Sequence, residues 1–350
     1  RPGTASGVAR TGASDARAHS RFLQRPPAAH MRVLVTGGGG FIGQHVVAGL
    51  ERAGHEPLVL DRNLPSHARD FVLGDVRDAS FVAQQVKRVD AVIHLAAVVG
   101  FVHVLRARID TLTTGLLGTH NVLEACLTFG RPMHLTSSSS VYGEAPEPAA
   151  EYRPSVVGLT QMASSCYAYS KAAEECLAFA YAQERGGRVR VVRLFNVVGP
   201  GQSAASGFVL PRFVRAAVAG TPLKVYAPGT QTRTFMDVRD AVQCLLELWQ
   251  TPEADGQLVN IGGTVTCTML ELAERVCRVC DSGSEIHIVG APYRSYQDIH
   301  ERHPDLTKLW QLIGRRDLRS LDETIAMVRD SVTATPSWDV AADDEGMVGT

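Results

Sequence analysis

The chain has 350 residues, of which 45% are hydrophobic and 20% charged, and its formal net charge at pH 7 is −1. This length accommodates one large or two medium domains, and the near-zero charge gives no electrostatic reason to expect a nucleic acid or an anionic membrane as a partner. The seven cysteines are an odd number scattered along a long chain, which favours a reducing compartment, the cytoplasm, over a disulfide framework.

Residues 1–30 differ in composition from the rest, with five arginines and a single acid, Asp15. We expect a disordered or non-native extension ahead of the first strand, and a transit peptide is the alternative. The longest apolar stretch, residues 91–105, is interrupted by His94, Gly100 and His103 and is too short to span a bilayer.

Strand-like and helical patterns alternate over residues 31–195. Such alternation predicts right-handed crossovers and a Rossmann-type, doubly wound parallel α/β sheet whose ligands lie beyond the carboxyl ends of the strands. The predicted strands are 32–36, 57–61, 70–73, 90–95, 132–137 and 189–195, and the predicted helices are 42–53, 79–87, 104–128 and 167–185.

Shorter elements follow over residues 196–330 and predict a smaller mixed α/β lobe that binds substrate, with a flexible tail over 331–350. The expected helices are 209–219, 237–250 and 268–280, and the expected strands are 222–226, 233–236 and 257–261. Cys277 and Cys280 fall on one face of the last of these helices, and no second ligand pair completes a zinc site, so we predict no metal.

The first predicted strand runs directly into the glycine-rich turn Gly37-x-x-Gly40-x-x-Gly43. A turn of this kind lets backbone N–H groups and the positive end of the following helix approach a pyrophosphate. Four consecutive glycines could also form a simple flexible loop, but the strand before them and the helical pattern after them favour dinucleotide binding.

Acidic residues end the next two predicted strands. Asp61 lies eighteen residues after Gly43, where a carboxylate can accept hydrogen bonds from the adenosine ribose and repel a 2′-phosphate, which favours NAD over NADP. The neighbouring Arg62 could instead hold that phosphate. Asp75 lies where an acid can meet the adenine amino group, and capping of the following helix is an almost equally good interpretation.

A row of hydroxyl groups, Thr136-Ser-Ser-Ser-Ser140, follows the fifth predicted strand, and Tyr167 and Lys171 lie four residues apart at a predicted helix start. Positions i and i+4 share a helix face, so the Lys171 ammonium is expected beside the Tyr167 phenol. A nearby cation lowers the pKa of tyrosine from ~10. This predicts a general base that takes the proton from a sugar hydroxyl as hydride leaves its carbon.

The chain resembles the extended short-chain dehydrogenase/reductase family, in its nucleotide-sugar epimerase, dehydratase and decarboxylase branch, over residues 31 to about 330. The resemblance rests on Thr36–Gly43, Ser-Ser-Val-Tyr-Gly143, Tyr167-x-x-x-Lys171, Arg193–Pro200 and Gly229–Asp237. It implies NAD as cofactor and three catalytic residues: Ser138 pairs with Tyr167 at the sugar 4-position, and Lys171 also holds the nicotinamide ribose.

The residues predicted to bind NAD are the two catalytic residues Tyr167 and Lys171 together with Gly37, Gly40, Phe41, Ile42, Gly43, Asp61, Arg62, Asp75, Val76, Leu95, Ala96 and Ala97. The resemblance places the nucleotide sugar, with a UDP-sugar favoured, against Ser139, Ser140, Asn196, Tyr226, Arg233, Arg302 and Asp305. It also implies a homodimer formed through the helices at 104–128 and 167–185, although their apolar faces could equally be core.

The branches share oxidation at C4 and differ in the steps after it. The 4,6-dehydratases carry Asp-Glu where this chain has Ser139 and Ser140, which argues against dehydration. The decarboxylase-like subgroup usually reads Thr-Ser-Glu in the serine run and carries an arginine where this chain has Ser164. We therefore expect a 4-epimerase, with a UDP-glucuronate decarboxylase as the close alternative.

Two points remain open in the sequence. Gly115 replaces an asparagine common in the family that helps to order the active site, which puts efficient turnover in doubt. A non-catalytic NAD-binding sensor would be expected to lose Tyr167 or Lys171, and both are present, so an enzyme is favoured. The sequence leaves the nucleotide and the sugar undetermined.

Overall fold

The computed structural model describes residues 30–64, 68–144, 147–290 and 299–334, except for the side chains at 163 and 164. The expected extension before residue 30 and the tail beyond residue 334 lie outside these residues. Within the described ranges, none of the helices has both the length and the apolar character needed to cross a membrane.

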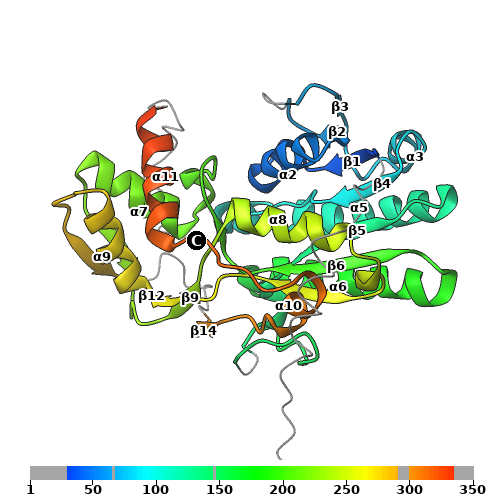
Figure 1. Cartoon of the computed structure of the whole chain (residues 1–350). Helices are drawn as coiled ribbons and strands as arrows, with labels where there is room; N and C mark the ends of the chain where they lie inside the picture. The colour runs from blue at the N-terminus through cyan, green and yellow to red at the C-terminus, as the bar shows by residue number, and fades with distance from the viewer. Residues whose placement is uncertain (1–29, 65–67, 145–146, 291–298, 335–350) are drawn as a thin grey trace, which may run out of the picture.

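The centre of the molecule is a seven-stranded, all-parallel sheet in the order β3-β2-β1-β4-β5-β6-β11, as Figure 1 shows. This confirms the predicted doubly wound α/β fold. The last strand comes from the second half of the chain and pairs with β6, so the sheet is completed across the predicted boundary at residue 195. The strands are β1 (Arg32–Thr36), β2 (Glu56–Asp61), β3 (Phe71–Leu73), β4 (Ala91–His94), β5 (Met133–Ser138), β6 (Val189–Leu194) and β11 (Leu258–Ile261).

Helices cover both faces of the sheet. Because successive strand residues point to opposite faces, Val33 and Val35 of β1 enter one hydrophobic core and Leu34 enters the other. The first core lies under α2 (Phe41–Arg52), α8 (Val238–Trp249) and α10 (Thr307–Ile313). The second lies under α3 (Ala79–Val86), α5 (Arg108–Phe129) and α6 (Ala163–Arg185).

The helix predicted at 104–128 is two helices, α4 (Phe101–Arg106) and α5, because Ala107 leaves the helical conformation with φ −133° and ψ 52°. The helix predicted from 167 begins four residues earlier, at Ala163. Tyr167 therefore lies in the second turn of α6 and not at its start. Helix α10 and α11 (Leu321–Ala334) are additional to the predicted elements.

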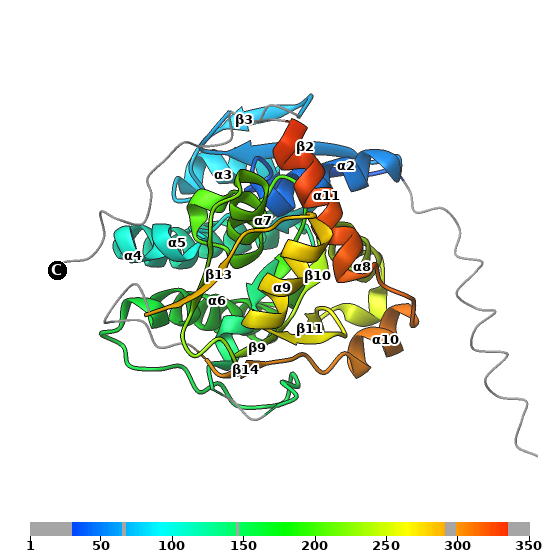
Figure 2. The same cartoon turned by 90° about the vertical axis from the view of Figure 1, so that its left-hand side faces the viewer.

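The second lobe packs α7 (Val209–Ala219), α9 (Met269–Val279) and α11 around their own hydrophobic core. It lies beyond the carboxyl ends of the sheet strands, at the left of Figure 1 and toward the viewer in Figure 2. Its short strands are β7 (Val197–Val198), β8 (Leu223–Tyr226), β9 (Thr232–Thr234), β10 (Met236–Asp237), β12 (Thr266–Thr268), β13 (Ile286–Val289) and β14 (Glu301–Arg302); single helical turns lie at η2 (Ser139–Tyr142), η3 (Ala204–Ser206) and η4 (Pro252–Ala254).

Asn260 on β11 is fully buried and ties the end of the sheet to the loops around it. Its Oδ1 accepts a hydrogen bond from the Tyr142 hydroxyl at 2.8 Å, and its Nδ2 donates to the carbonyls of Ala149 at 2.8 Å and Asp305 at 3.2 Å. These buried bonds hold the segment after β5, which carries the serine run, against the end of β11.

One buried histidine makes the stability of the sheet depend on pH. His134 on β5 is fully buried, and neither of its ring nitrogens has a hydrogen-bond partner among the described residues. Burial, with a smaller contribution from Arg190, lowers the pKa of His134 to about 3 from 6.5. Below pH 6.5 the unfolded chain binds a proton that the folded protein does not, so acidification destabilises the fold by about 1.4 kcal/mol per pH unit for this group.

We therefore expect His134→Leu to weaken the loss of stability on acidification. Between pH 7.5 and 5 the variant should lose about 2 kcal/mol less of its free energy of unfolding than the parent, because one proton-binding group has been removed from the unfolded state. Urea unfolding at the two pH values measures this difference. Equal losses in parent and variant would contradict the assignment.

Candidate active site

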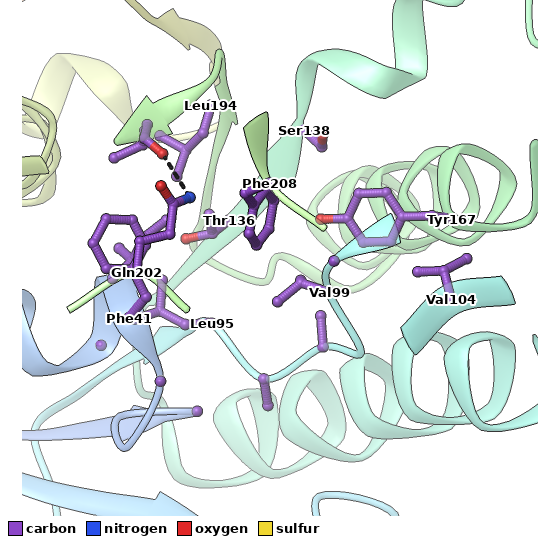
Figure 3. A pocket seen from close by; sticks show the side chains of 18 of the residues that line it. Phe41, Leu95, Val99, Val104, Thr136, Ser138, Tyr167, Leu194, Gln202 and Phe208 are labelled. Atoms are coloured by element: carbon purple, nitrogen blue, oxygen red, sulfur yellow. Dashed lines mark hydrogen bonds between the residues drawn. The ribbon is translucent and has the colours of Figure 1, made fainter. Parts of the chain in front are cut away.

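A cavity of about 640 Å³ lies between the carboxyl ends of the central strands and the second lobe. Its lining runs from the glycine-rich turn after β1, past the ends of β2, β4 and β5, to Arg302 on β14. Figure 3 shows Tyr167 from α6 and Phe208 from the second lobe facing into it. A cavity at this edge of a doubly wound sheet is the expected place for a ligand.

The glycine-rich turn is shaped for an anion. Gly37 has φ +69°, and a Cβ there would lie 2.8 Å from the backbone of Ala96, while a Cβ at Gly43 would lie 2.3 Å from the Gly37 carbonyl oxygen. Helix α2 begins after Gly40 with no side-chain cap and no acid in its first turn, so far as the described residues show. Its positive end therefore suits the pyrophosphate of a dinucleotide.

Asp61, at the end of β2, lies beside this turn. Its Oδ2 accepts a hydrogen bond from the backbone N–H of Gly39 at 3.0 Å, which orients the carboxylate at the rim of the cavity. Arg62 also lines the cavity, and its Nη1 lies 3.2 Å from Oδ2 of Asp110. This placement fits a carboxylate that binds the adenosine ribose, with the neighbouring guanidinium engaged by another acid.

Asp75 lines the same end of the cavity but does not cap a helix. Its carboxylate pairs with the Arg77 side chain, and hydrogen bonds from that guanidinium lower the pKa of Asp75 below its usual value. Asp78 is the residue that caps α3, through a bond from the Phe81 N–H at 3.0 Å. The remaining predicted NAD-binding residues also line the cavity: Phe41, Ile42, Val76, Leu95, Ala96 and Ala97.

Ser138, Tyr167 and Lys171 converge at the other end of the cavity. Tyr167 directs its hydroxyl into the cavity in Figure 3, and Ser138, at the end of β5, lines the same cavity and lowers the pKa of the phenol. The Lys171 ammonium is buried behind it and donates hydrogen bonds to the Thr136 carbonyl at 3.0 Å and to Oε2 of Glu174 at 2.8 Å. The structure thus brings the three predicted catalytic residues together.

The acidity of the phenol differs from the sequence-based expectation. Burial raises the pKa of Tyr167 above 10, and the Glu174 carboxylate raises it further. The Lys171 ammonium lowers it, as expected, and Ser138 lowers it too, but together they do not offset the burial. Lys171 alone therefore does not make the phenol a base near neutral pH, which corrects the expectation.

Four of the predicted substrate residues line the cavity, namely Ser139, Ser140, Asn196 and Arg302. The Ser140 hydroxyl is buried and has no hydrogen-bond partner among the described residues. Arg302 also lines the cavity; of the other described cations in its lining, Arg62 pairs with Asp110 and the Lys171 ammonium donates to the Thr136 carbonyl.

Three other predicted substrate residues do not line this cavity. The Arg233 guanidinium donates to the carbonyls of Thr232 and Ile299, the Tyr226 ring lies under the guanidinium of Arg212, and Oδ1 of Asp305 accepts the Thr307 N–H. The first two side chains therefore contact the second lobe, and Asp305 lies at the start of α10, which packs on the central sheet. Residues 295–298 of the predicted substrate loop, and the Ser164 side chain, lie outside the described part of the chain.

The sequence analysis did not identify several residues of the reacting end. Phe208 and Gln202 of the second lobe line the cavity, and Gln202 donates from Nε2 to the Val197 carbonyl at 3.2 Å (Figure 3). Both lie between Gly201 and the predicted helix at 209–219, where no periodic pattern marks them. Val99, from the segment between β4 and α4, and Phe101, the first residue of α4, also line the cavity.

Comparison with known proteins agrees with this geometry. The model of the NAD dependent epimerase/dehydratase family matches residues 33–262. The chain is 32% identical over 296 residues to a UDP-N-acetyl-alpha-D-glucosaminuronate decarboxylase of Bacillus cytotoxicus, which covers 80% of this chain and 91% of that protein. It is 33% identical over 328 residues to UDP-glucuronic acid decarboxylase 6 of Arabidopsis thaliana, with coverage of 89% and 90%.

A solved structure extends the likeness to the three-dimensional fold. The UDP-glucose 4-epimerase of Thermus thermophilus, in complex with NAD, superposes with a TM-score of 0.76 at 27% identity and covers 87% of this chain and 99% of that one. The geometry of the glycine-rich turn and the likeness to a structure in complex with NAD therefore both indicate an NAD site.

Gly43→Ala tests the turn. The added methyl group would have to displace the Gly37 carbonyl, so we expect the affinity for NAD, measured by isothermal titration calorimetry, to fall roughly tenfold or more. Gly283→Ala is the matched control, because nothing lies within 4 Å of a Cβ at that position. A folded Gly43→Ala protein with unchanged NAD affinity would contradict the proposed geometry.

Proposed function

We propose that this chain, which belongs to the NAD-dependent epimerase/dehydratase family and is an NAD-dependent enzyme of nucleotide sugars, removes the carboxyl group of a UDP-linked uronic acid through a 4-keto sugar. The observation that carries the proposal is that Arg302 lines the same cavity as the serine run. A guanidinium there pairs with a carboxylate in a fixed fork geometry.

The first step is oxidation at C4 of the sugar. Tyr167, as phenolate, takes the proton of the C4 hydroxyl, and the Ser138 hydroxyl holds the same oxygen by a hydrogen bond. Bound NAD⁺ would accept the hydride from C4 and add a positive charge that favours the phenolate. Burial of the Lys171 ammonium beside Tyr167 keeps a second positive charge there without admitting water.

Oxidation at C4 makes the uronate a β-keto acid, which loses carbon dioxide readily. The next step therefore requires no acidic side chain from the protein. The C5–C6 bond breaks, carbon dioxide leaves, and the electron pair moves onto the 4-keto oxygen as an enolate. Ser139 and Ser140 supply hydroxyl groups beside the sugar, and Arg302 holds the departing carboxylate. A proton from water then adds to C5, and return of the hydride to C4 with the Tyr167 proton gives the pentose.

A 4-epimerase is the second candidate, and it is the one that the sequence analysis preferred. The Ser138–Ser140 run, which carries no acid, and the likeness to a 4-epimerase structure support it. Epimerisation needs only that the 4-keto sugar rotate in the cavity, so that the hydride returns to the opposite face of C4. The named relatives at 32% and 33% identity are decarboxylases, which moves our proposal to the alternative that the sequence analysis had ranked second.

The assembly remains a proposal. On α5, Ile109 is 82% exposed and Leu117 51% exposed, so this helix presents apolar side chains that a second copy could cover. We propose a homodimer through α5 and α6 on this ground, and we retain UDP as the nucleotide and the cytoplasm as the compartment.

Decarboxylation is tested by incubating the purified protein with NAD and UDP-glucuronate. We expect carbon dioxide and a UDP-pentose or its 4-keto form, and we expect Tyr167→Phe to lower the rate roughly 10²–10⁴-fold while NAD binding persists. Tyr169→Phe is the matched control, because its hydroxyl bonds the Gly158 carbonyl at 2.7 Å and does not line the cavity. Formation of an isomer without carbon dioxide would favour the epimerase. The absence of any reaction would contradict both candidate functions.

Arg302→Leu tests how the carboxylate is held. Loss of a charge-assisted hydrogen bond costs about 1.5–3 kcal/mol, so kcat/KM for UDP-glucuronate should fall roughly 10- to 100-fold. Binding of UDP-glucose, which lacks the carboxylate, should change much less in a competition assay. An equal loss for both nucleotide sugars would place Arg302 on the diphosphate and remove the main support for a uronate substrate.

A further inference from the structure

A buried carboxylate, that of Glu174, contacts the predicted catalytic residue Lys171. Glu174 follows Lys171 by three residues on α6, and its side chain is 1% exposed. Its Oε2 accepts from the Lys171 ammonium at 2.8 Å and from the Thr119 hydroxyl of α5 at 3.4 Å. Its Oε1 accepts from the Ser170 hydroxyl at 2.9 Å. A buried carboxylate is tolerated only when it is paired in this way.

Gly115 on α5 provides the space that this carboxylate occupies. A Cβ at Gly115 would lie 2.4 Å from Oε1 of Glu174 and 2.1 Å from the Ser170 hydroxyl oxygen, both far inside contact distance. Gly115 and Gly118 both lie inside α5, where glycine costs helix stability relative to alanine. The absence of a side chain at Gly115 therefore leaves the room that the Glu174 carboxylate on the neighbouring helix needs.

We propose that Glu174 is a positioning residue of the reaction: from the space left by Gly115 it holds the Lys171 ammonium against the Thr136 carbonyl and beside the Tyr167 phenol. The proposal rests on the role assigned above to Tyr167 and Lys171. The same carboxylate keeps Lys171 protonated despite its burial. It thereby sets the pH range in which a phenolate at Tyr167 and an ammonium at Lys171 coexist.

The charges around Glu174 determine the sign of its effect. Lys171 and Tyr167 face it on α6, the neutral Thr119 faces it from α5, and His94 on β4 bonds the same threonine at 3.2 Å. Burial lowers the pKa of His94 to about 3, so this histidine is uncharged at neutral pH.

The other nearby acid has a separate partner. Glu175 also raises the pKa of Lys171, but less than Glu174 does, and its carboxylate is held by the Arg193 guanidinium of β6 at 2.6 and 2.8 Å. The negative charge of Glu174 disfavours loss of a proton from both Lys171 and Tyr167 and therefore raises both pKa values.

Glu174→Gln removes the charge and keeps a side chain of the same shape. Both pKa values should then fall, so the acid and alkaline limbs of the pH–rate profile should move to lower pH. The alkaline limb should move by roughly one unit or more, because Lys171 loses its contacting charge. The midpoint of Tyr167 ionisation should move the same way. In the NAD-loaded protein it is read as the 295 nm absorbance difference between each protein and the same protein carrying Tyr167→Phe.

Two further variants complete the experiment. Glu124→Gln removes a partly exposed carboxylate of α5 that pairs with Arg185, and it should leave both limbs in place. Gly115→Ala keeps every charge but forces the Glu174 carboxylate to move, so it should shift the limbs as Glu174→Gln does. It serves as an independent test where Glu174→Gln does not yield folded protein.

The outcomes separate the inference from the proposed function. A fall in rate with unmoved limbs and an unmoved Tyr167 midpoint would make Glu174 a merely structural residue and overturn the inference, as would an unchanged profile. The absorbance titration requires no sugar substrate. A shifted Tyr167 midpoint in a protein inactive on UDP-glucuronate would therefore support the inference while the proposed substrate fails.

Discussion

The reacting end of the cavity depends on one buried cation. The Lys171 ammonium has almost no exposure, yet it remains in the interior because the Thr136 carbonyl and the Glu174 carboxylate accept its hydrogen bonds. A buried charge is stable only with such partners. Removing the Lys171 ammonium or the Glu174 carboxylate would leave the other charge buried and uncompensated. The arrangement therefore couples β5 to α6 and places a positive charge beside the phenol of Tyr167.

The same sheet edge collects every other part of the site. Parallel strands end at one edge, so the glycine-rich turn after β1, Asp61 of β2 and Ser138 of β5 meet there although they are distant in sequence. The second lobe closes the cavity by bringing Phe208 and Arg302 over that edge. The proposed oxidation of the sugar and the proposed binding of its carboxylate by Arg302 would then take place in one cavity.

The surroundings of the Tyr167 phenol determine how readily it loses its proton. Burial opposes ionisation of Tyr167, and the nearby acid opposes it too, while two neighbours favour it. Further positive charge beside the phenol would favour its ionisation, and an oxidised nicotinamide would supply such a charge. The Ser170 hydroxyl and the Glu174 carboxylate of the adjacent helix occupy the space beside Gly115, where the family resemblance leads us to expect an asparagine side chain.

Local patterns in the sequence were sufficient for the sheet, most helices, the glycine-rich turn, and the Ser138, Tyr167 and Lys171 group, because periodicity, turn chemistry and helical spacing are short-range properties. They could not show that the side chains of Arg233, Tyr226 and Asp305 make contacts outside the cavity lining, nor that Phe208 and Gln202 do line it. They also could not show that burial raises the pKa of Tyr167. Those outcomes depend on which distant segments pack together and exclude water, and only the tertiary structure decides that.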